Sequence, residues 1–410
     1  MSGIVVMLSA TEHQLRLIVA RSQKLEETVK AQVTAVKELA AEKEQVSTQL
    51  TELRQRVAEL EHLEANIDHQ HGEATLTLRE AAVEYSKTQL LAKRYQNTVA
   101  ELRGQCRAVI VSRNTPSGFA VPDACTVEVA DDVAFCFDHV VNDTAPDSEA
   151  FGTVQMANDT LAGFNTCGFS FGPSGAGKTN AIFGESGAAK LFVKEIFDGL
   201  VENEVTHFSM RCSFGELYND HFIDHLGEFG HTLSVGSTTE IRSLQVQTLD
   251  ETMRYIDLGL ERVRGQTRRE GHVFFALSVE NFNRKGHFRK GSALFVDLAG
   301  AGGAGPGHRA ADNQWVVRSL SSLCNSIAML SGGSPNHDAL PSSTLMRLLR
   351  EALGGNSKAT MIVAIDESTS HEENLSALTY ASHFKSVVNS PTPYDIPAEL
   401  QRLNLEAATA

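Results

Sequence analysis

The sequence predicts an α/β domain, with a central mixed sheet covered by helices on both faces, preceded by an α-helical coiled coil. Apolar residues recur at a heptad period over most of the first hundred residues, and apolar stretches typical of buried strands alternate with helical patterns after them. In addition, a glycine-rich loop with the GxxxxGKT pattern lies between a predicted strand and a predicted helix. The chain therefore combines a rod with a P-loop NTPase domain.

Composition places the boundary between these two parts near Gly104. The 410 residues exceed one ordinary hydrophobic core. The part before this glycine has few aromatic residues and no proline, since the first proline is Pro116. We therefore expect a coiled-coil stalk and neck over residues 1–103, a globular domain over residues 104–390 and a short tail over residues 391–410.

Charge and cysteine content exclude several classes of function. Lys and Arg number 36 against 51 Asp and Glu, a net charge of −15, and 13 basic against 15 acidic residues up to Arg103 leave −13 for the rest. This balance disfavours nucleic acid and anionic membranes as partners. The six cysteines show no metal or disulfide spacing. Since no apolar run could cross a bilayer and residues 3–10 do not resemble a signal peptide, we expect a soluble intracellular protein.

The heptad pattern is strongest between Leu15 and Ile67. Steps of three and four residues give sixteen positions, of which twelve are apolar, and proline is absent. This pattern predicts a supercoiled helix and favours dimerisation over the alternative, a single helix folded back on the globular domain. Polar Gln32, Lys43 and Glu64 at core positions reduce stability and select register or partner, so a homodimer and a heterodimer are both allowed.

Beyond this segment the same register continues as far as Leu102. His71 and Gly72 lie near the start of the continuation, and glycine lowers helix stability. We therefore expect that junction to be the weakest point of the rod.

The strongest functional pattern follows the predicted strand Thr166–Phe171 and precedes helix-compatible sequence. Its glycines let backbone N–H groups turn toward phosphates, Lys178 reaches the β and γ oxygens of a nucleoside triphosphate, and the Thr179 hydroxyl ligates Mg²⁺. The alternative is a glycine-rich turn that binds nothing. The predicted nucleotide-binding residues of this loop are Gly172, Pro173, Ser174, Gly175, Ala176, Gly177, Lys178 and Thr179.

A second segment supports the same site. Residues 294–297 form an apolar strand that ends in Asp297, and Gly300 follows. This arrangement is typical of an aspartate on the metal side with a glycine that senses the γ-phosphate. Taken alone, it would more often be a turn, but its pairing with the loop favours the functional interpretation.

At these residues the chain resembles the kinesin motor domain, from about Glu101 to Asn389. The similar segments, in the family's order, are Phe135–Asp138, Gly163–Thr179, Ser213–Asn219, Asp297–Gly300, Ser319–Leu323 and Leu353–Lys358. A coiled coil that ends at residues 101–104, just before the first strand, is similar to the carboxy-terminal-motor kinesins, which are typically minus-end-directed.

The resemblance implies a kinesin-like motor domain that binds ATP and Mg²⁺ and couples ATP hydrolysis to movement along microtubules. It implies that Thr179 and Asp297 hold the metal, and that Arg113 contacts the adenine side of the nucleotide. The catalytic residues that it implies are Lys178, Thr179, Asp297 and Gly300. The implied location is the cytoplasm, on microtubules of the cytoskeleton including the spindle, with tubulin and a second kinesin-like chain as partners.

The switch motifs depart from the family pattern. Residues 268–272 stand where the family has SSRSH, and Arg268 and Arg269 replace both serines whose hydroxyls hold the metal and the attacking water in the family. Glu270 and Gly302 stand at the arginine and glutamate positions of an ion pair that closes the site around ATP. Loss of both partners predicts slow hydrolysis or none.

The segments that correspond to the family's base-contacting strand and to its microtubule-binding segment also depart from the family pattern. Val111–Asn114 replaces RxRP, although Arg113 remains. Leu340–Leu345 replaces YRxSKL, so Pro341 and Thr344 stand where the family has basic residues, and attraction to acidic tubulin is weakened. A reduced basic patch is left, formed by Arg318, Arg347, Arg350 and Lys358.

Three hypotheses for function remain. The first is a divergent carboxy-terminal-motor kinesin, and the intact phosphate loop favours it. The second is a non-catalytic kinesin-like subunit whose coiled coil pairs it with an active motor, and the altered switch residues favour that alternative. The third is a triphosphate-binding scaffold without a microtubule role, which the altered filament side favours.

Overall fold

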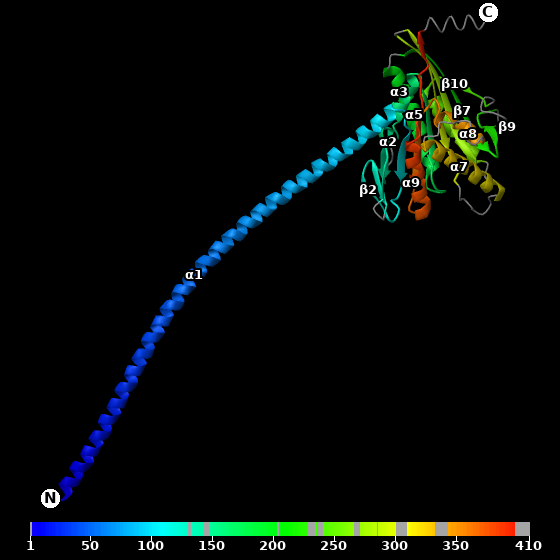
Figure 1. Cartoon of the computed structure of the whole chain (residues 1–410). Coiled ribbons are helices and arrows are strands. Elements are labelled where there is room, and N and C mark those ends of the chain that lie inside the picture. Colours follow the sequence, from blue (N-terminus) through cyan, green and yellow to red (C-terminus); the bar gives the residue numbers. More distant parts are fainter. Residues whose placement is uncertain are drawn as a thin grey trace, which may run out of the picture. The chain divides into compact units, whose positions relative to one another are not determined.

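A computed structural model provides the structure of the chain (Figure 1). It describes residues 2–129, 133–142, 147–202, 205–227, 234–235, 241–265, 271–284, 286–300, 310–332 and 343–397. The chain divides into two compact units, Met1–Ser86 and Lys87–Ala410. The second unit carries the α/β fold that the sequence predicts.

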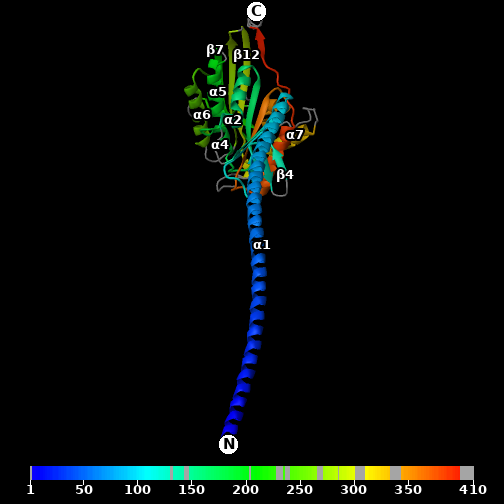
Figure 2. The ribbon, with the colours of Figure 1, turned by 90° about the vertical axis from the view of Figure 1, so that its left-hand side faces the viewer.

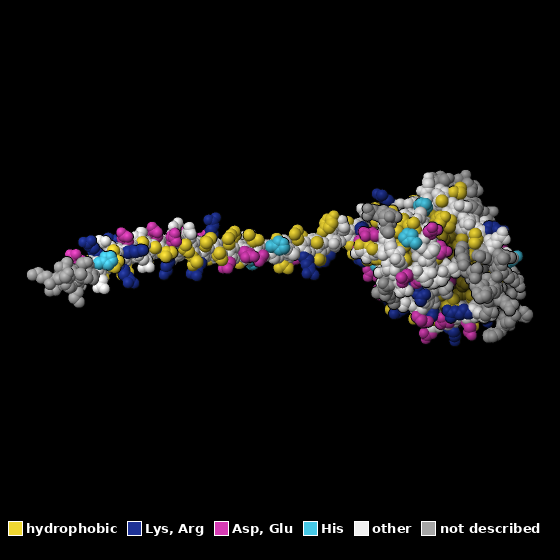
Figure 3. Space-filling view, turned by 90° about the horizontal axis from the view of Figure 1, so that it is seen from below, with side chains coloured by type: hydrophobic (Ala, Val, Ile, Leu, Met, Phe, Trp, Pro, Cys, Tyr) yellow, Lys and Arg dark blue, Asp and Glu magenta, His cyan; other side chains and the backbone are white. Residues whose placement is uncertain are grey.

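The first unit is part of a single helix, α1 (Ser2–Leu102). Its heptad residues are exposed, from 45% at Leu50 to 71% at Leu78. An exposed apolar stripe of this kind, which Figure 3 shows along α1, is compatible with the predicted coiled coil, in which such a stripe packs against a second helix. The helix continues through His71 and Gly72 without a break, so the junction expected to be weak is not a helix end.

The last turns of α1, from Lys87 onward, belong to the second unit. Lys93 Nζ donates to Asp123 Oδ2 at 2.6 Å, and this hydrogen bond raises the pKa of Lys93. Asn97 Oδ1 accepts from Lys385 Nζ at 2.9 Å. The end of the rod is therefore bonded to the globular fold through polar side chains, and the predicted domain boundary stays a prediction.

The central sheet is mixed, as predicted. Its strand order is β5-β1-β13-β6-β12-β11-β7-β8-β9, with β10 paired to β7 and β14 paired to β12. Strands β5 to β12 in this order are parallel, whereas β12, β11 and β7 are antiparallel. The bounds are β1 (Arg107–Ser112), β5 (His139–Asn142), β6 (Asn165–Phe171), β7 (Val205–Tyr218), β8 (His221–Asp224), β9 (Ser234–Val235), β10 (Leu244–Val246), β11 (His272–Asn283), β12 (His287–Asp297), β13 (Lys358–Ile365) and β14 (Asp395–Pro397).

Helices cover both faces of this sheet (Figure 2). One face packs against α3 (Thr153–Leu161), α4 (Lys178–Phe183), α5 (Ala188–Glu202) and α6 (Leu249–Arg264). The other face packs against α7 (Ala310–Ser331), α8 (Thr344–Leu348) and α9 (His371–Lys385). The remaining elements are α2 (Ser148–Phe151), a 3₁₀ turn (Arg350–Ala352) and a small antiparallel sheet of β2 (Phe119–Asp123), β3 (Thr126–Val129) and β4 (Val133–Cys136). In the described part of the chain, no helix has the length and apolar character needed to cross a membrane.

Local sequence explains why the elements form where they do. Strands β1 and β13 are nearly continuous runs of buried apolar residues, as expected for parallel strands covered on both faces. Thr248 caps α6 by accepting from the Glu251 backbone N–H at 3.2 Å. Ser370 and Glu373 form a reciprocal capping box at the start of α9. Buried strands and capped helices thus fix the layered order.

The chain returns to the sheet after α9. The Asn389 side chain donates to the carbonyl oxygens of Ala352 and Ser357 at 3.1 and 2.6 Å. At β14, Asp395 accepts from Arg289 Nε at 3.1 Å and contacts His287 Nδ1 at 2.7 Å. The segment predicted as a tail, residues 391–410, thus contains the strand β14, which pairs with β12.

Cysteine burial tests this packing. Cys136 is exposed, whereas Cys167 and Cys212 are buried in the sheet, and burial raises the pKa of both thiols to about 12. Because the thiolate is the reacting species, we expect a maleimide to modify Cys136 in the native protein and the two buried thiols only after denaturation. Peptide mass spectrometry measures the order, with Cys136→Ser as the control. Fast native labelling of Cys167 would contradict the sheet described above.

Candidate functional site

The predicted phosphate loop joins β6 to α4 at the centre of the sheet. Gly172 and Gly177 have φ of 130° and 100°, in the left-handed region that glycine adopts most readily. A Cβ at Gly172 would collide with the Ala364 carbonyl oxygen, and one at Gly177 would press on the Arg113 side chain. Both positions therefore require glycine, and the loop curves in the way that a backbone cradle for phosphate requires.

The loop lysine is held by the loop itself. Lys178 is 7% exposed, and its Nζ donates to the carbonyl oxygens of Gly172 at 3.0 Å and Pro173 at 2.6 Å. A Cβ placed on Gly300 would lie 3.0 Å from this Nζ and 2.8 Å from the Ser174 Cα. The phosphate loop and the segment with Gly300, which the sequence predicts to lie near the γ-phosphate, are thus in close contact. Only glycine fits at position 300.

A hydrogen-bonded cluster joins the loop to the end of β12. Thr179 Oγ1 donates to Asp297 Oδ2 at 2.6 Å, and Ser170 Oγ donates to Asp297 Oδ1 at 2.9 Å. Ser170 Oγ also accepts from the Leu298 backbone N–H at 3.0 Å. Because β6 and β12 are parallel neighbours, their carboxyl ends meet at one edge of the sheet and place these groups together.

The Asp297 carboxyl group is buried and 7% exposed. Burial raises its pKa, and the hydrogen bonds from Thr179 and Ser170 and the charge of Lys178 act in the opposite direction. A buried carboxylate beside a hydroxyl is an oxygen donor set that suits a hard cation such as Mg²⁺. The residues predicted to hold the metal therefore fit that group.

All of the predicted residues of the site lie together. Arg113 follows β1, and its side chain packs over Gly177 at the end of the phosphate loop. Ser170 was not predicted as a site residue. Its signal in the sequence is weak, because β6 also carries polar side chains at Asn165 and Thr166, and the importance of Ser170 depends on which strand lies beside β6.

A second unpredicted group connects this site to α7. The His272 side chain is fully buried, and burial lowers its pKa to about 3, so the ring is neutral. Its Nδ1 accepts from the Ala299 backbone N–H at 3.0 Å, which leaves the ring proton on Nε2. That proton is donated to Ser319 Oγ at 2.8 Å, and Ser319 donates to the Val316 carbonyl oxygen at 2.8 Å. The ring also packs against Trp315, with centroids 5.1 Å apart. The segment after Asp297 is thus bonded to α7.

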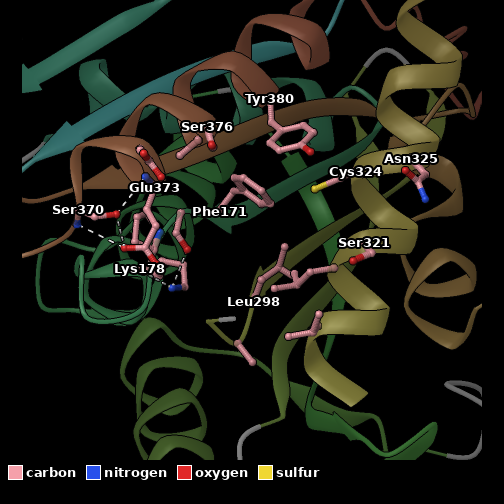
Figure 4. A pocket seen from close by; sticks show the side chains of 17 residues that line it. Phe171, Lys178, Leu298, Ser321, Cys324, Asn325, Ser370, Glu373, Ser376 and Tyr380 are labelled. Atoms are coloured by element: carbon pink, nitrogen blue, oxygen red, sulfur yellow. Dashed lines mark hydrogen bonds between the residues drawn. The ribbon is translucent and has the colours of Figure 1, made fainter. Parts of the chain in front are cut away.

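A cavity of about 800 Å³ lies beside the loop, between α7 and α9 (Figure 4). Among the described residues of the phosphate loop, it is lined by Gly172, Pro173 and Lys178. Cys324 of α7 and Tyr380 of α9 lie next to each other in its lining, and burial raises the pKa of Cys324 to about 11. The cavity therefore borders the loop lysine on the side of α7.

Several predicted departures lie outside the described residues, namely Arg268, Arg269, Glu270, Gly302 and Pro341. Their consequences for the switch motifs stay predictions. Thr344, by contrast, is described. It is the first residue of α8, is 6% exposed, and accepts from Arg347 NH2 at 3.3 Å. A basic side chain is absent from this position, and the threonine packs inward.

Three of the four predicted basic patch residues are exposed on the α7 and α8 side. Arg318 lies in α7, Arg347 in α8 and Arg350 in the turn after α8, and all three are exposed. Lys358 is different, because its Nζ bonds Asp159 Oδ1 of α3 at 2.7 Å and lies 4.6 Å from the centroid of the Phe164 ring. Its charge is already paired on the opposite face of the sheet. The predicted patch is therefore reduced to the three arginines.

Comparison with known proteins gives a consistent result. A family model described as the kinesin motor domain matches residues 94–387. Kinesin-like protein KIN-14E of Arabidopsis thaliana is 26% identical over 392 residues, which cover 84% of this chain and 31% of that protein. The kinesin heavy chain of Neurospora crassa is 29% identical over 346 residues, which cover 76% of this chain and 37% of that protein. The chain spans about a third of the length of these curated relatives.

Solved structures agree on the fold. The structure of a fast kinesin is 25% identical, with a TM-score of 0.62, and the match covers 74% of this chain and 99% of that chain. A KIF14 dimer solved in complex with a microtubule is 22% identical, with a TM-score of 0.61 and coverage of 70% and 96%. The second unit thus has the architecture of these motor structures.

Asp297→Asn tests the buried carboxyl group. Because its folded-state pKa lies above the usual 3.8, the folded state binds the proton more tightly, so stability falls as pH rises from 3.8 through the folded pKa and stays reduced above it. We expect the ligand-free variant to be more stable than the parent chain at neutral pH, with a flatter pH dependence of its free energy of unfolding in urea. Asp159→Asn, which removes the partner of Lys358, is the contrasting control and should lose stability. A loss in both variants would contradict this electrostatic account.

Proposed function

The chain belongs to the kinesin motor domain family, and from this premise we propose that its second unit is an ATP-dependent microtubule motor. The observation that carries the proposal is the 2.6 Å contact between Thr179 Oγ1 and Asp297 Oδ2. It joins the phosphate loop to the aspartate on the metal side, which is the pair of groups that positions Mg²⁺ on a triphosphate in P-loop NTPases.

We assign each predicted residue a role in that site. ATP with Mg²⁺ supplies the phosphoanhydride bond and the charge neutralisation. Thr179 and Asp297 hold the metal side, and the backbone around Gly172 and Gly177 holds the phosphate oxygens. Lys178 Nζ leaves the carbonyl oxygens of Gly172 and Pro173 and donates to phosphate oxygens instead. Gly300 senses whether a γ-phosphate is bound, because it lies against the lysine Nζ.

Hydrolysis, in this proposal, is in-line attack of water on the γ-phosphate, and it is slow. The serines that would position the metal and the water are replaced by Arg268 and Arg269, and the closing ion pair has lost both members, at Glu270 and Gly302. Arginine binds phosphate oxygens but offers no hydroxyl to a metal or water. ATP binding is therefore retained more fully than turnover.

The residues around α7 and α8, which correspond to the family's microtubule-binding side, support weak binding to microtubules. Arg318, Arg347 and Arg350 are exposed around α7 and α8, and a chain with a net charge of −15 gains little long-range attraction to acidic tubulin. The buried link from the Ala299 backbone through His272 to Ser319 is a physical route between the nucleotide site and α7. We propose that microtubule binding is weak and is coupled to the nucleotide through α7.

Direction and location follow from the resemblance to carboxy-terminal-motor kinesins. The rod precedes the motor domain, and the chain is similar to KIN-14E and to KIN-14I of Oryza sativa, at 26% and 25% identity. We propose minus-end-directed movement on cytoplasmic microtubules, including those of the spindle, by a dimer joined through α1.

A second candidate is a non-catalytic subunit that binds nucleotide or microtubules and pairs with an active motor. The altered residues Arg268, Arg269, Glu270 and Gly302 favour it. It predicts ATP binding without turnover, whereas the motor proposal predicts turnover that microtubules stimulate.

Phosphate release from ATP distinguishes these candidates. We expect slow basal release by the full chain, an increase on adding microtubules at low salt, and a loss of roughly a hundredfold or more in Lys178→Ala, because that ammonium stabilises the phosphate oxygens. Lys194→Ala, at an exposed position of α5, is the matched control and should retain activity. ATP binding with no turnover above Lys178→Ala would exclude the motor and leave the non-catalytic subunit.

A further inference from the structure

We propose that Ser174 of the phosphate loop orients the water that attacks the γ-phosphate. This inference rests on the proposed function and assigns a residue to its chemical step. The loop from Gly172 to Lys178 contains a single hydroxyl side chain, that of Ser174. Ser174 is half-buried, and its Oγ has no hydrogen-bond partner among the residues that the structure describes. The hydroxyl group is therefore available to a ligand or a water molecule in the site.

Ser174 lies at the end of the site where the γ-phosphate is expected. A Cβ placed on Gly300 would be 2.8 Å from the Ser174 Cα, 2.9 Å from the Ser174 Cβ and 3.0 Å from Lys178 Nζ. Ser174 and the ammonium group therefore border the same face of Gly300. Pro173, the residue before Ser174, accepts from that ammonium group at 2.6 Å. The serine thus lies beside both groups that we assign to the γ-phosphate.

The neighbouring residues limit how far Ser174 can move. The ring of Pro173 fixes the backbone before it, and Gly175 after it has a φ of 83°, in the left-handed region. The next residue, Ala176, is 1% exposed and anchors the loop in the fold. A hydroxyl group on such a restrained backbone needs little reordering to hold a water molecule in one orientation.

The attacking water needs a hydrogen-bond acceptor, which basic side chains do not offer. Arg268 and Arg269 stand at the positions of the family's two serines, and a guanidinium group only donates. The two hydroxyl groups beside Asp297 are already used as donors to that carboxyl group. A serine hydroxyl has one donor and two acceptor lone pairs. Ser174 can therefore accept from the water and donate to a γ-phosphate oxygen at the same time.

In the proposed step, the water oxygen bonds to the γ phosphorus as the bond from that phosphorus to the bridging oxygen breaks. The electron pair of the broken bond leaves with ADP. One proton of the water passes to a γ-phosphate oxygen by way of Ser174, whose hydroxyl gives up its own proton as it takes the proton of the water. ATP⁴⁻ and water thus give ADP³⁻ and H₂PO₄⁻, and the serine is unchanged.

Ser174→Ala and Ser174→Thr test this role in the full chain. Single-turnover cleavage of ATP with Mg²⁺ and microtubules measures the chemical step apart from product release. We expect Ser174→Ala to lower the cleavage rate roughly 10- to 100-fold, because an oriented proton acceptor is lost. Its Kd for a non-hydrolysable ATP analogue should stay within about twofold, because the backbone cradle is intact. Ser174→Thr keeps the hydroxyl and should recover cleavage to within about threefold.

Ser209→Ala, at an exposed serine of β7, is the matched control and should cleave ATP at the parental rate. Urea unfolding checks that each variant is folded. A merely structural role of Ser174 would lower analogue affinity or stability together with cleavage, and that result would overturn the assignment.

Two further results separate this assignment from the proposed function. A parent chain that binds ATP but does not cleave it, with or without microtubules, would contradict both. Cleavage by the parent chain that Ser174→Ala does not slow would contradict only the role of Ser174. In that case, slower cleavage in Glu270→Gln would assign the water to the Glu270 carboxylate instead.

Discussion

Asp297 accepts hydrogen bonds from Ser170 at the end of β6 and from Thr179 at the start of α4. The nucleotide site and its connection to α7 in the second unit depend on this buried contact. The contact exists because β12 lies beside β6 in parallel, so that both strands bring polar groups to one edge of the sheet. Burial of the carboxyl group raises its pKa and makes its charge unfavourable without a cation. The ligand-free fold is therefore less stable because of this buried charge, and binding of a metal ion with a triphosphate would restore the lost stability.

The same edge of the sheet is also connected to α7. The segment that follows Asp297 places the Ala299 N–H on His272 and, through that ring, reaches Ser319 in α7. A neutral imidazole suits this position, because it accepts on one nitrogen and donates on the other inside an apolar layer that includes Trp315. A change in the backbone after β12 would alter these hydrogen bonds directly. The segment after Asp297 is thus joined to α7 by a continuous chain of hydrogen bonds.

Much of this was readable from the sequence, for reasons that differ by residue. The loop and Asp297 are local patterns, since a few adjacent residues define their chemistry. The helical conformation of the first hundred residues follows from the heptads. Ser170 and His272 could not be found in this way, because their roles depend on which strands and helices become neighbours. Lys358 shows the reverse case, in which a residue expected on an exposed patch is paired with Asp159 on the other face.

Isothermal titration of the purified chain with ATP, with Mg²⁺ and then with excess EDTA, tests the central claim most directly. If Thr179 and Asp297 form the metal side of a phosphate-binding loop, binding should be detectable with Mg²⁺ and should weaken by roughly tenfold or more without it. Thr179→Ala should lose that difference while it retains the weaker binding. Equal affinity with and without the metal, or no binding in either condition, would contradict the account.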